Sequence, residues 1–174
     1  LSSLVLIAGG AVIAVLAVAL WLLQVPLFQL LGADETALTY IRTYWGPQLF
    51  SAWLGALLYF MYSVFRAHGD TRMPGKMMVL SSLINLALDP LFIFGVGGWE
   101  GWGLPGAAWA TAVAFSVGLL LTGAKLRRCQ WATMDDIGQE AVRSWRPFTG
   151  IAAPAMVSQL MPPLAAMLAI AAVA

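Results

Sequence analysis

The sequence predicts an all-α membrane protein, a polytopic bundle of transmembrane helices, on three observations. First, 61% of its 174 residues are hydrophobic and only 10% are charged, whereas a soluble domain carries about a quarter charged residues. Second, the chain holds several uncharged runs of about 20 residues, the length that an α-helix needs to cross a bilayer. Third, its lysines and arginines gather between these runs. We therefore expect lipid as the solvent and about five spans.

The expected spans lie at about 4–31, 38–65, 74–94, 104–124 and 150–174. Pro47 falls inside the second run, where it removes one backbone hydrogen bond and predicts a kink. Gly69 suits the end of that helix, and Pro74 suits the first turn of the next. The fourth run repeats small residues every four positions, at Gly106, Ala110, Ala114 and Gly118. This pattern lets helices pack closely in a bilayer, so the fourth span is expected to be an interior helix.

The basic residues predict the orientation of the bundle. Eight of the nine fall in two segments on the same side, with Arg66, Arg72 and Lys76 in one and Lys125, Arg127, Arg128, Arg143 and Arg146 in the other, and only Arg42 lies opposite. The positive-inside rule places both segments in the cytoplasm, so the segments that hold Asp34 and Glu100 face outward. We expect a multi-pass protein of the plasma membrane, the inner membrane if the source is bacterial. The second basic segment predicts either a short surface helix that begins near Thr133 or a disordered basic loop.

Several classes of function are disfavoured by the residues present. The single Cys129 and the single His68 leave no disulfide framework and no pair of soft metal ligands. The sequence contains no Gly-rich phosphate loop, no nucleophile paired with a histidine and no two-histidine metal pattern, so we expect neither an enzyme nor a cofactor. The net charge of +1 gives no indication of nucleic-acid binding. The opening residues lack the features of a signal peptide, and we expect a fragment of a larger chain.

Asp89 is the main functional candidate, because an ionisable residue inside a span costs roughly 2.5–3.5 kcal/mol on insertion scales. Asn85 lies one turn earlier on the same helix face, and Ser81 and Ser82 continue the polar stripe. A carboxylate, an amide and hydroxyls suit a proton or a hard cation such as sodium, since both prefer oxygen partners. No other metal is expected.

Pro90 strengthens this interpretation, because it cannot donate to the carbonyl of Leu86 and predicts a kink beside the acid. In the alternative interpretation, Asp89 and Pro90 only end the helix near the interface. Thr111 in the fourth span either hydrogen-bonds across to the polar stripe or bonds its own helix backbone. For the segment from Arg66 to Arg72, a role in topology and helix capping is favoured over binding of lipid headgroups.

The motifs resemble a known family in their order and spacing. They are Tyr40-Ile41-Arg42 with Gly46 and Pro47, the segment Arg66-Ala67-His68-Gly69-Asp70-Thr71-Arg72-Met73-Pro74, the segment from Asn85 to Gly95, and the segment from Gly103 to Thr111. Together they resemble the MATE (multidrug and toxic compound extrusion) efflux transporters, and most closely the DinF-like branch. The resemblance covers nearly the whole chain.

The resemblance implies a twelve-helix, two-lobe fold of which this chain is a fragment. Residues 1–124 would form transmembrane helices three to six of the N-lobe, 125–149 the cytoplasmic connector between lobes, and 150–174 the first, truncated helix of the C-lobe. In this branch an Asn, an Asp and a Thr form part of a cation site, and the matching positions are Asn85, Asp89 and Thr111. The family's partner acid would precede Leu1. Some members use a glutamate in the seventh helix, but this sequence has Pro162 near that place, which leaves proton and sodium coupling both open.

The implied function is export of cationic or amphipathic drugs and toxic compounds, in exchange for protons or sodium, by alternating access. The implied partners are the lipid bilayer, small cationic or amphipathic substrates and the remainder of the chain. Two alternatives stay open. A lipid-linked oligosaccharide flippase of the same superfamily would need basic residues within its cavity, and no Lys or Arg lies in the middle of a span. A non-transporting membrane scaffold would have no need of Asp89.

Overall fold

The computed structural model describes residues 2–30, 32, 34–129, 161–162 and 165. The chain divides into two compact units, one formed by Ser2–Thr133 and the other containing Met134–Ala174. The expected connector helix near Thr133 lies outside the described residues. The same holds for the expected span at 150–174, except for residues 161, 162 and 165, which are helical.

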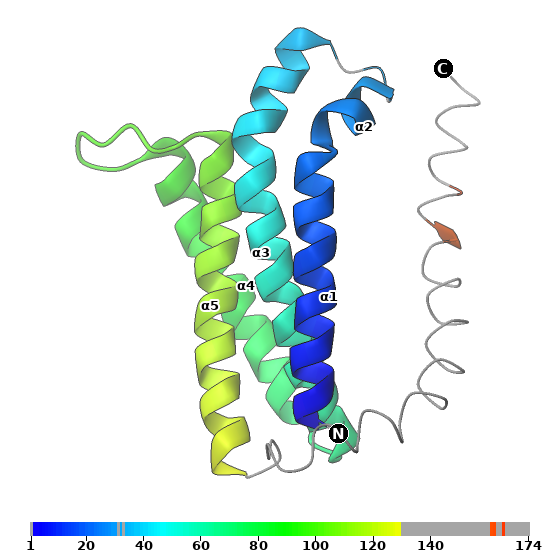
Figure 1. The fold of residues 1–174 in the computed structure, drawn as a ribbon. Coiled ribbons are helices and arrows are strands. Elements are labelled where there is room, and N and C mark those ends of the chain that lie inside the picture. The colour runs from blue at the N-terminus through cyan, green and yellow to red at the C-terminus, as the bar shows by residue number, and fades with distance from the viewer. Residues whose placement is uncertain (1, 31, 33, 130–160, 163–164, 166–174) are drawn as a thin grey trace. The chain divides into compact units, whose positions relative to one another are not determined.

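The described residues of the unit Ser2–Thr133 form five helices, which are shown in Figure 1. They are α1 (Ser2–Leu22), α2 (Gln24–Leu30), α3 (Glu35–Ala67), α4 (Arg72–Phe94) and α5 (Leu104–Arg128). Among the described residues, α3, α4 and α5 are long and apolar enough to cross a membrane, and α1 supplies a shorter apolar stretch, Gly9–Leu22. The predicted all-α membrane fold is confirmed, with three candidate spans in the described part of the chain.

The first expected span, 4–31, is wrong as one continuous helix. The helix is interrupted at Leu23, so that α1 ends at Leu22 and α2 begins at Gln24. The physical reason is Pro26, which has no N–H to donate and whose ring crowds the carbonyl four residues earlier, that of Leu22. Helix-like hydrogen bonds continue on both sides of the break, from the Leu23 N–H to Ala19 at 2.9 Å and from the Leu27 N–H to Leu23 at 3.0 Å.

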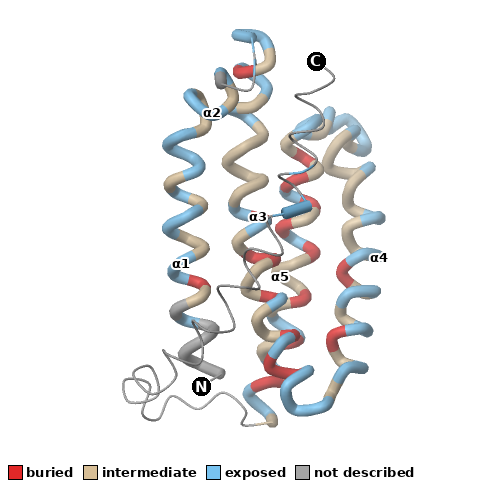
Figure 2. Tube along the Cα trace, turned by 90° about the vertical axis from the view of Figure 1, so that its right-hand side faces the viewer, coloured by how far each residue is buried: buried red, intermediate tan, exposed pale blue. Residues whose placement is uncertain are grey.

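Helix α5 is the central helix of the unit and packs against both α3 and α4, which contact each other far less. Figure 2 shows the buried residues concentrated along α5 and on the part of α3 beside it. The predicted small-residue face is buried throughout, at Gly106, Ala110, Ala114 and Gly118. A Cβ atom added at Gly106 would run into the backbone carbonyl of Phe92 in α4. The prediction of an interior helix is confirmed, because the small residues on this face let the neighbouring helices approach α5 closely.

The turn between α3 and α4 is capped by its own backbone and one side chain. Gly69 adopts a φ of +80°, which favours glycine, and its N–H bonds the Arg66 carbonyl at 3.0 Å. The Asp70 N–H bonds the Phe65 carbonyl at 3.0 Å, which completes a Schellman motif. The Asp70 carboxylate then accepts from the Met73 N–H at 3.0 Å, at the start of α4. The expected capping by Gly69 is confirmed, and Arg66 takes part in it through its backbone carbonyl.

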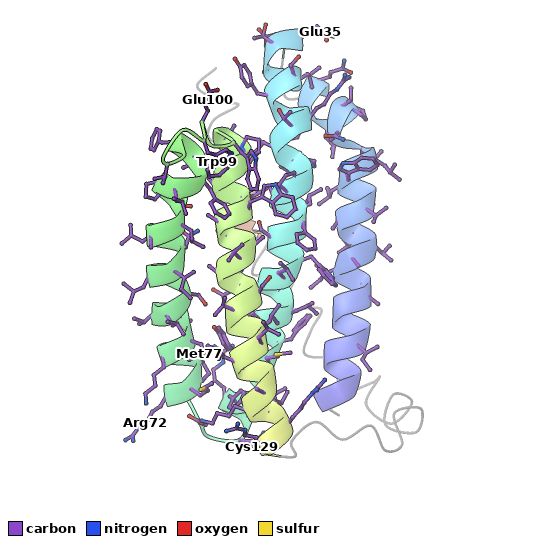
Figure 3. All side chains as sticks on the ribbon, turned by 90° about the vertical axis from the view of Figure 1, so that its left-hand side faces the viewer. Glu35, Arg72, Met77, Trp99, Glu100 and Cys129 are labelled. Carbon is purple, nitrogen blue, oxygen red and sulfur yellow. The ribbon has the colours of Figure 1, made fainter. Side chains whose placement is uncertain are left out.

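The loop between α4 and α5 folds back over the end of α4. The N–H groups of Trp102 and Gly103 donate to the carbonyls of Phe92 and Ile93 at 2.8 and 3.2 Å. The rings of Phe92, Trp99 and Trp102 pack edge to face. Figure 3 shows Trp99 and Glu100 at one end of the bundle and Arg72 and Cys129 at the other. We call these the Glu100 end and the Arg72 end.

Candidate functional site

The polar stripe of α4 lies against α5. Ser81, Asn85 and Asp89 follow one another at four-residue intervals and are buried or half-buried. Helix α4 continues through Pro90 to Phe94. The alternative in which Asp89 and Pro90 end the helix is therefore wrong, because the helix extends one further turn toward the Glu100 end.

Asn85 joins the two helices through its amide group. Its Nδ2 donates to Oδ1 of Asp89 at 3.3 Å and to Oγ1 of Thr111 on α5 at 3.1 Å. The Thr111 hydroxyl in turn donates to the Ala107 carbonyl at 3.0 Å. Both interpretations of Thr111 hold, since the hydroxyl bonds its own helix and also accepts from the stripe. We call Asn85, Asp89 and Thr111 the Asp89 cluster.

The Asp89 cluster offers oxygen atoms to a small cation. Asp89 contributes a carboxylate of which Asn85 engages one oxygen, and Thr111 retains a lone pair. Pro90 leaves the Leu86 carbonyl without its helical donor one turn away. Among the described residues no group of three or more His, Cys, Asp or Glu side chains could hold a metal ion. Oxygen donors with one carboxylate suit a proton or sodium.

A cavity of about 280 Å³ adjoins the Asp89 cluster on the side of the Arg72 end. Its lining comes from α3, α4 and α5, and consists of Leu58, Tyr59, Tyr62, Met78, Ser81, Ser82, Asn85, Thr111, Ala114 and Phe115. Asn85 and Thr111 thus face the cavity, while none of its lining residues is charged. The hydroxyls of Tyr62 and Ser81 are buried and make no hydrogen bond to the described part of the chain.

Tyr62 is the residue of this region that sequence reasoning missed. It is 2% exposed and follows Leu54 and Leu58 at four-residue spacing on the buried face of α3. A tyrosine within an otherwise apolar helical stripe indicates a polar group nearby in the interior, because a buried tyrosine hydroxyl normally finds a hydrogen-bond partner. The sequence alone does not say which helix faces it.

The remaining predicted residues lie apart from the Asp89 cluster. Pro47 lies inside α3, next to Gly46, where an added Cβ atom would lie 3.8 Å from the indole nitrogen of Trp21 on α1. Arg66 and Arg72 are exposed at the Arg72 end, and Arg66 donates to the Ser63 hydroxyl at 3.2 Å. Because α4 rises 1.5 Å per residue, this loop motif is roughly 25 Å from Asp89 along the helix.

Asp70 forms an ion pair that the sequence did not predict. Its Oδ2 lies 3.2 Å from Nζ of Lys125, in the last turn of α5, and that ammonium also lies 5.6 Å from the ring centre of Phe65. The Met73 backbone N–H, followed by the Lys125 side chain, holds the pKa of the Asp70 carboxyl below its usual range. The pair links the start of α4 to the end of α5.

Residues 2–91 match the protein family described as MatE. A protein of Shewanella oneidensis named FAD transporter is 40% identical over 144 residues, which are 80% of this chain and 31% of that protein. The probable multidrug resistance protein YoeA of Bacillus subtilis is 31% identical over 115 residues, 66% of this chain and 25% of that protein. The chain thus spans less than a third of the length of these relatives.

Solved structures of the Vibrio cholerae MATE transporter VcmN show the same fold. A crystal structure of a VcmN mutant gives a TM-score of 0.90 at 44% identity, over 97% of this chain and 37% of that chain. The bent form of VcmN gives a TM-score of 0.86 at 43% identity with the same coverage. On this evidence the chain belongs to the MatE family, whose members are multi-pass membrane transporters and not enzymes.

Proposed function

We propose that the complete protein is a secondary active antiporter, in which Asp89 carries the coupling ion. It exports cationic or amphipathic compounds in exchange for protons or sodium by alternating access. The observation that carries this proposal is the Asp89 cluster, in which one acid inside an apolar helix is linked through Asn85 to Thr111 of a neighbouring helix. An acid in that environment is costly, so its presence favours a role in ion transport over a scaffold.

The coupling follows from the change of charge at Asp89. When a proton or sodium ion binds, the carboxylate is neutralised, and its hydrogen bond from Asn85 changes in strength. Because Asn85 also bonds Thr111, the change reaches α5, and Pro90 gives α4 a flexible point beside the acid. The two conformations then differ in their affinity for substrate, and the ion gradient drives the cycle.

A second candidate cargo is a flavin nucleotide, because a relative that is 40% identical is named FAD transporter. A diphosphate is recognised by basic side chains or by backbone N–H groups. No Lys or Arg lies in the middle of a described span, which favours cationic or neutral cargo over a diphosphate. The same lack of basic residues disfavours a lipid-linked diphosphate.

The test uses inverted membrane vesicles that contain the complete gene product. Uptake of a fluorescent cationic dye is measured under an imposed proton gradient or an imposed sodium gradient, for the wild type and for Asp89→Asn. Glu100→Gln is the matched control, since it removes an exposed carboxylate at the Glu100 end. We expect uptake by the wild type and the control but not by Asp89→Asn, and the gradient that works identifies the coupling ion.

Other outcomes would redirect the proposal. Equal uptake by the wild type and Asp89→Asn would mean that Asp89 is not the coupling residue. FAD uptake without dye uptake would make the flavin nucleotide the cargo. A wild type that moves neither compound under either gradient would favour the flippase or the scaffold.

A further inference from the structure

The cavity beside the Asp89 cluster has features that cation binding at Asp89 leaves unexplained. Tyr62 and Ser81 are 2% and 6% exposed, and both line the cavity. The two hydroxyls lie close to each other without meeting hydrogen-bond geometry, and neither finds a partner among the described residues. Buried hydroxyls without partners are unfavourable, so such groups are normally satisfied by ordered water.

The size and the chemistry of the cavity both suit water. A water molecule occupies about 30 Å³ in the liquid, so a volume of about 280 Å³ accommodates several molecules. A bound water needs two to four polar partners. The cavity offers the hydroxyls of Tyr62 and Ser81, the exposed hydroxyl of Ser82, and the Asn85 and Thr111 side chains of the Asp89 cluster. Leu58, Ala114 and Phe115 supply apolar parts of the lining.

The hydroxyls are arranged along a line from Asp89 toward the Arg72 end. Asp89, Asn85 and Ser81 follow at one-turn intervals along α4, so Ser81 lies about 12 Å from Asp89 along the helix axis. Ser81 lies against Gly118 of α5, because a Cβ added at that glycine would be 2.9 Å from the Ser81 hydroxyl. Thr122, one turn further along α5, is fully buried, and its hydroxyl has no hydrogen-bond partner in the described part of the chain.

We propose that this cavity holds a column of ordered water that conducts the coupling proton between Asp89 and the Arg72 end of the bundle, with Tyr62 and Ser81 as its protein contacts. The inference rests on the proposed function of Asp89. On release, the Asp89 carboxylic acid O–H bond breaks, and the carboxylate keeps the electron pair. The proton adds to a neighbouring water, which becomes hydronium and passes a proton along the column. Each hydroxyl accepts one proton and gives up another, so it is unchanged after each transfer.

The first experiment asks whether the cavity contains water in the complete wild-type protein. Brief X-ray irradiation generates hydroxyl radicals that label side chains in contact with ordered water, and mass spectrometry locates the label. We expect Tyr62 to be labelled despite its burial. Phe65 is the matched control, since it is an aromatic residue on the same helix, 0% exposed and packed in the core. Labelling of Tyr62 at the low rate of Phe65 would overturn the proposal.

The second experiment measures proton movement in proteoliposomes with an enclosed pH-sensitive dye. The double variant Tyr62→Phe with Ser81→Ala should lower substrate-driven proton flux by about tenfold or more, while equilibrium binding of the cationic dye is unchanged. Tyr40→Phe with Ser116→Ala is the control, because Tyr40 is exposed and the Ser116 hydroxyl bonds the Ala112 carbonyl at 2.7 Å. A proton flux in the double variant equal to that of the wild type would overturn the proposal. Transport that requires a sodium gradient and moves no protons would also overturn it.

These outcomes separate the two proposals. If Asp89→Asn abolishes transport and the double variant does not slow it, the site is correct and the water path is wrong. If Asp89→Asn transports normally, the proposed function fails, and the water path fails with it. Reduced flux together with labelled Tyr62 supports the path.

Discussion

The contact between α4 and α5 differs in kind at its two ends. Toward the Glu100 end it is closely packed and hydrogen-bonded, with Gly106 against the Phe92 carbonyl and Asn85 bonded to both Asp89 and Thr111. Toward the Arg72 end, beyond Asn85, the contact opens into the cavity, where the Ser81 hydroxyl has no hydrogen-bond partner among the described residues. The difference indicates that the first half fixes the geometry of the acid, whereas the second half provides space for something mobile.

The largest expected effect comes from filling the closely packed half. In Gly106→Ala, the new Cβ would collide with the backbone carbonyl of Phe92, which cannot move aside as a flexible side chain would. We expect a loss of about 1–3 kcal/mol or more, seen as a lower Tm of the complete protein in detergent.

The matched control for this change is Gly123→Ala on the same helix. Its Cβ would meet only the Met61 side chain at 3.8 Å, an ordinary contact. Since alanine also favours the helix by roughly 1 kcal/mol, this variant should be as stable as the wild type or more so. Equal losses in the two variants would show that the Gly106 contact is not as close as described.

The next effect comes from removing the hydrogen bonds of the Asp89 cluster. Asn85→Ala leaves the Asp89 carboxylate and the Thr111 hydroxyl without their shared donor. Half-buried polar groups deprived of a partner cost about 1–3 kcal/mol, so Tm should fall. Ser82→Ala, which removes an exposed hydroxyl from the same helix, should change stability by less than about 0.5 kcal/mol. A loss in the Ser82 variant as large as that in Asn85→Ala would contradict the prediction.

The sequence predicted those features of the contact between α4 and α5 that depend only on spacing along one helix. Asn85 and Asp89 are four residues apart, so their shared face follows from helix geometry. The small residues of α5 likewise predicted its central position. The bond to Thr111 was only one of two alternatives open from the sequence, because spacing along one helix carries no information about which residue of another helix lies opposite.

Other features required the three-dimensional arrangement. Tyr62 faces Ser81 only because α5, with its glycine at position 118, lets three helices meet there. The ion pair of Asp70 with Lys125 joins residues 55 positions apart, and neither residue is distinctive in its local sequence. The break at Leu23 had a local cause, since the effect of Pro26 falls on the carbonyl four residues earlier. Applied to the sequence, this effect of proline would have predicted two helices in place of one in the first expected span.

A smaller effect is expected in the open half of the contact. Ser81→Ala removes a hydroxyl that has no partner among the described residues. Loss of that group costs no protein hydrogen bond, so the stability of the complete protein should stay within about 0.5 kcal/mol of the wild type. Thermal unfolding of this variant beside Asn85→Ala checks the comparison directly. If both variants lose the same stability, the two halves of the contact are equally bonded, and the comparison fails.

The smallest expected effect lies at the Arg72 end, where Asp70→Asn keeps an acceptor for the Met73 N–H but loses the charge that attracts Lys125. The pKa of Asp70 is lowered in the folded protein from an ordinary value of 3.8. The charge therefore stabilises the fold fully above about pH 5, and this contribution is lost as the pH falls through the lowered pKa. The Tm difference between wild type and variant should be small and constant near neutral pH and should shrink below about pH 4. It should also diminish with added salt, because the ion pair is partly exposed and therefore screened. A difference that grew on acidification would mean that the pKa of Asp70 is raised, and that Lys125 does not hold the carboxylate in its charged form.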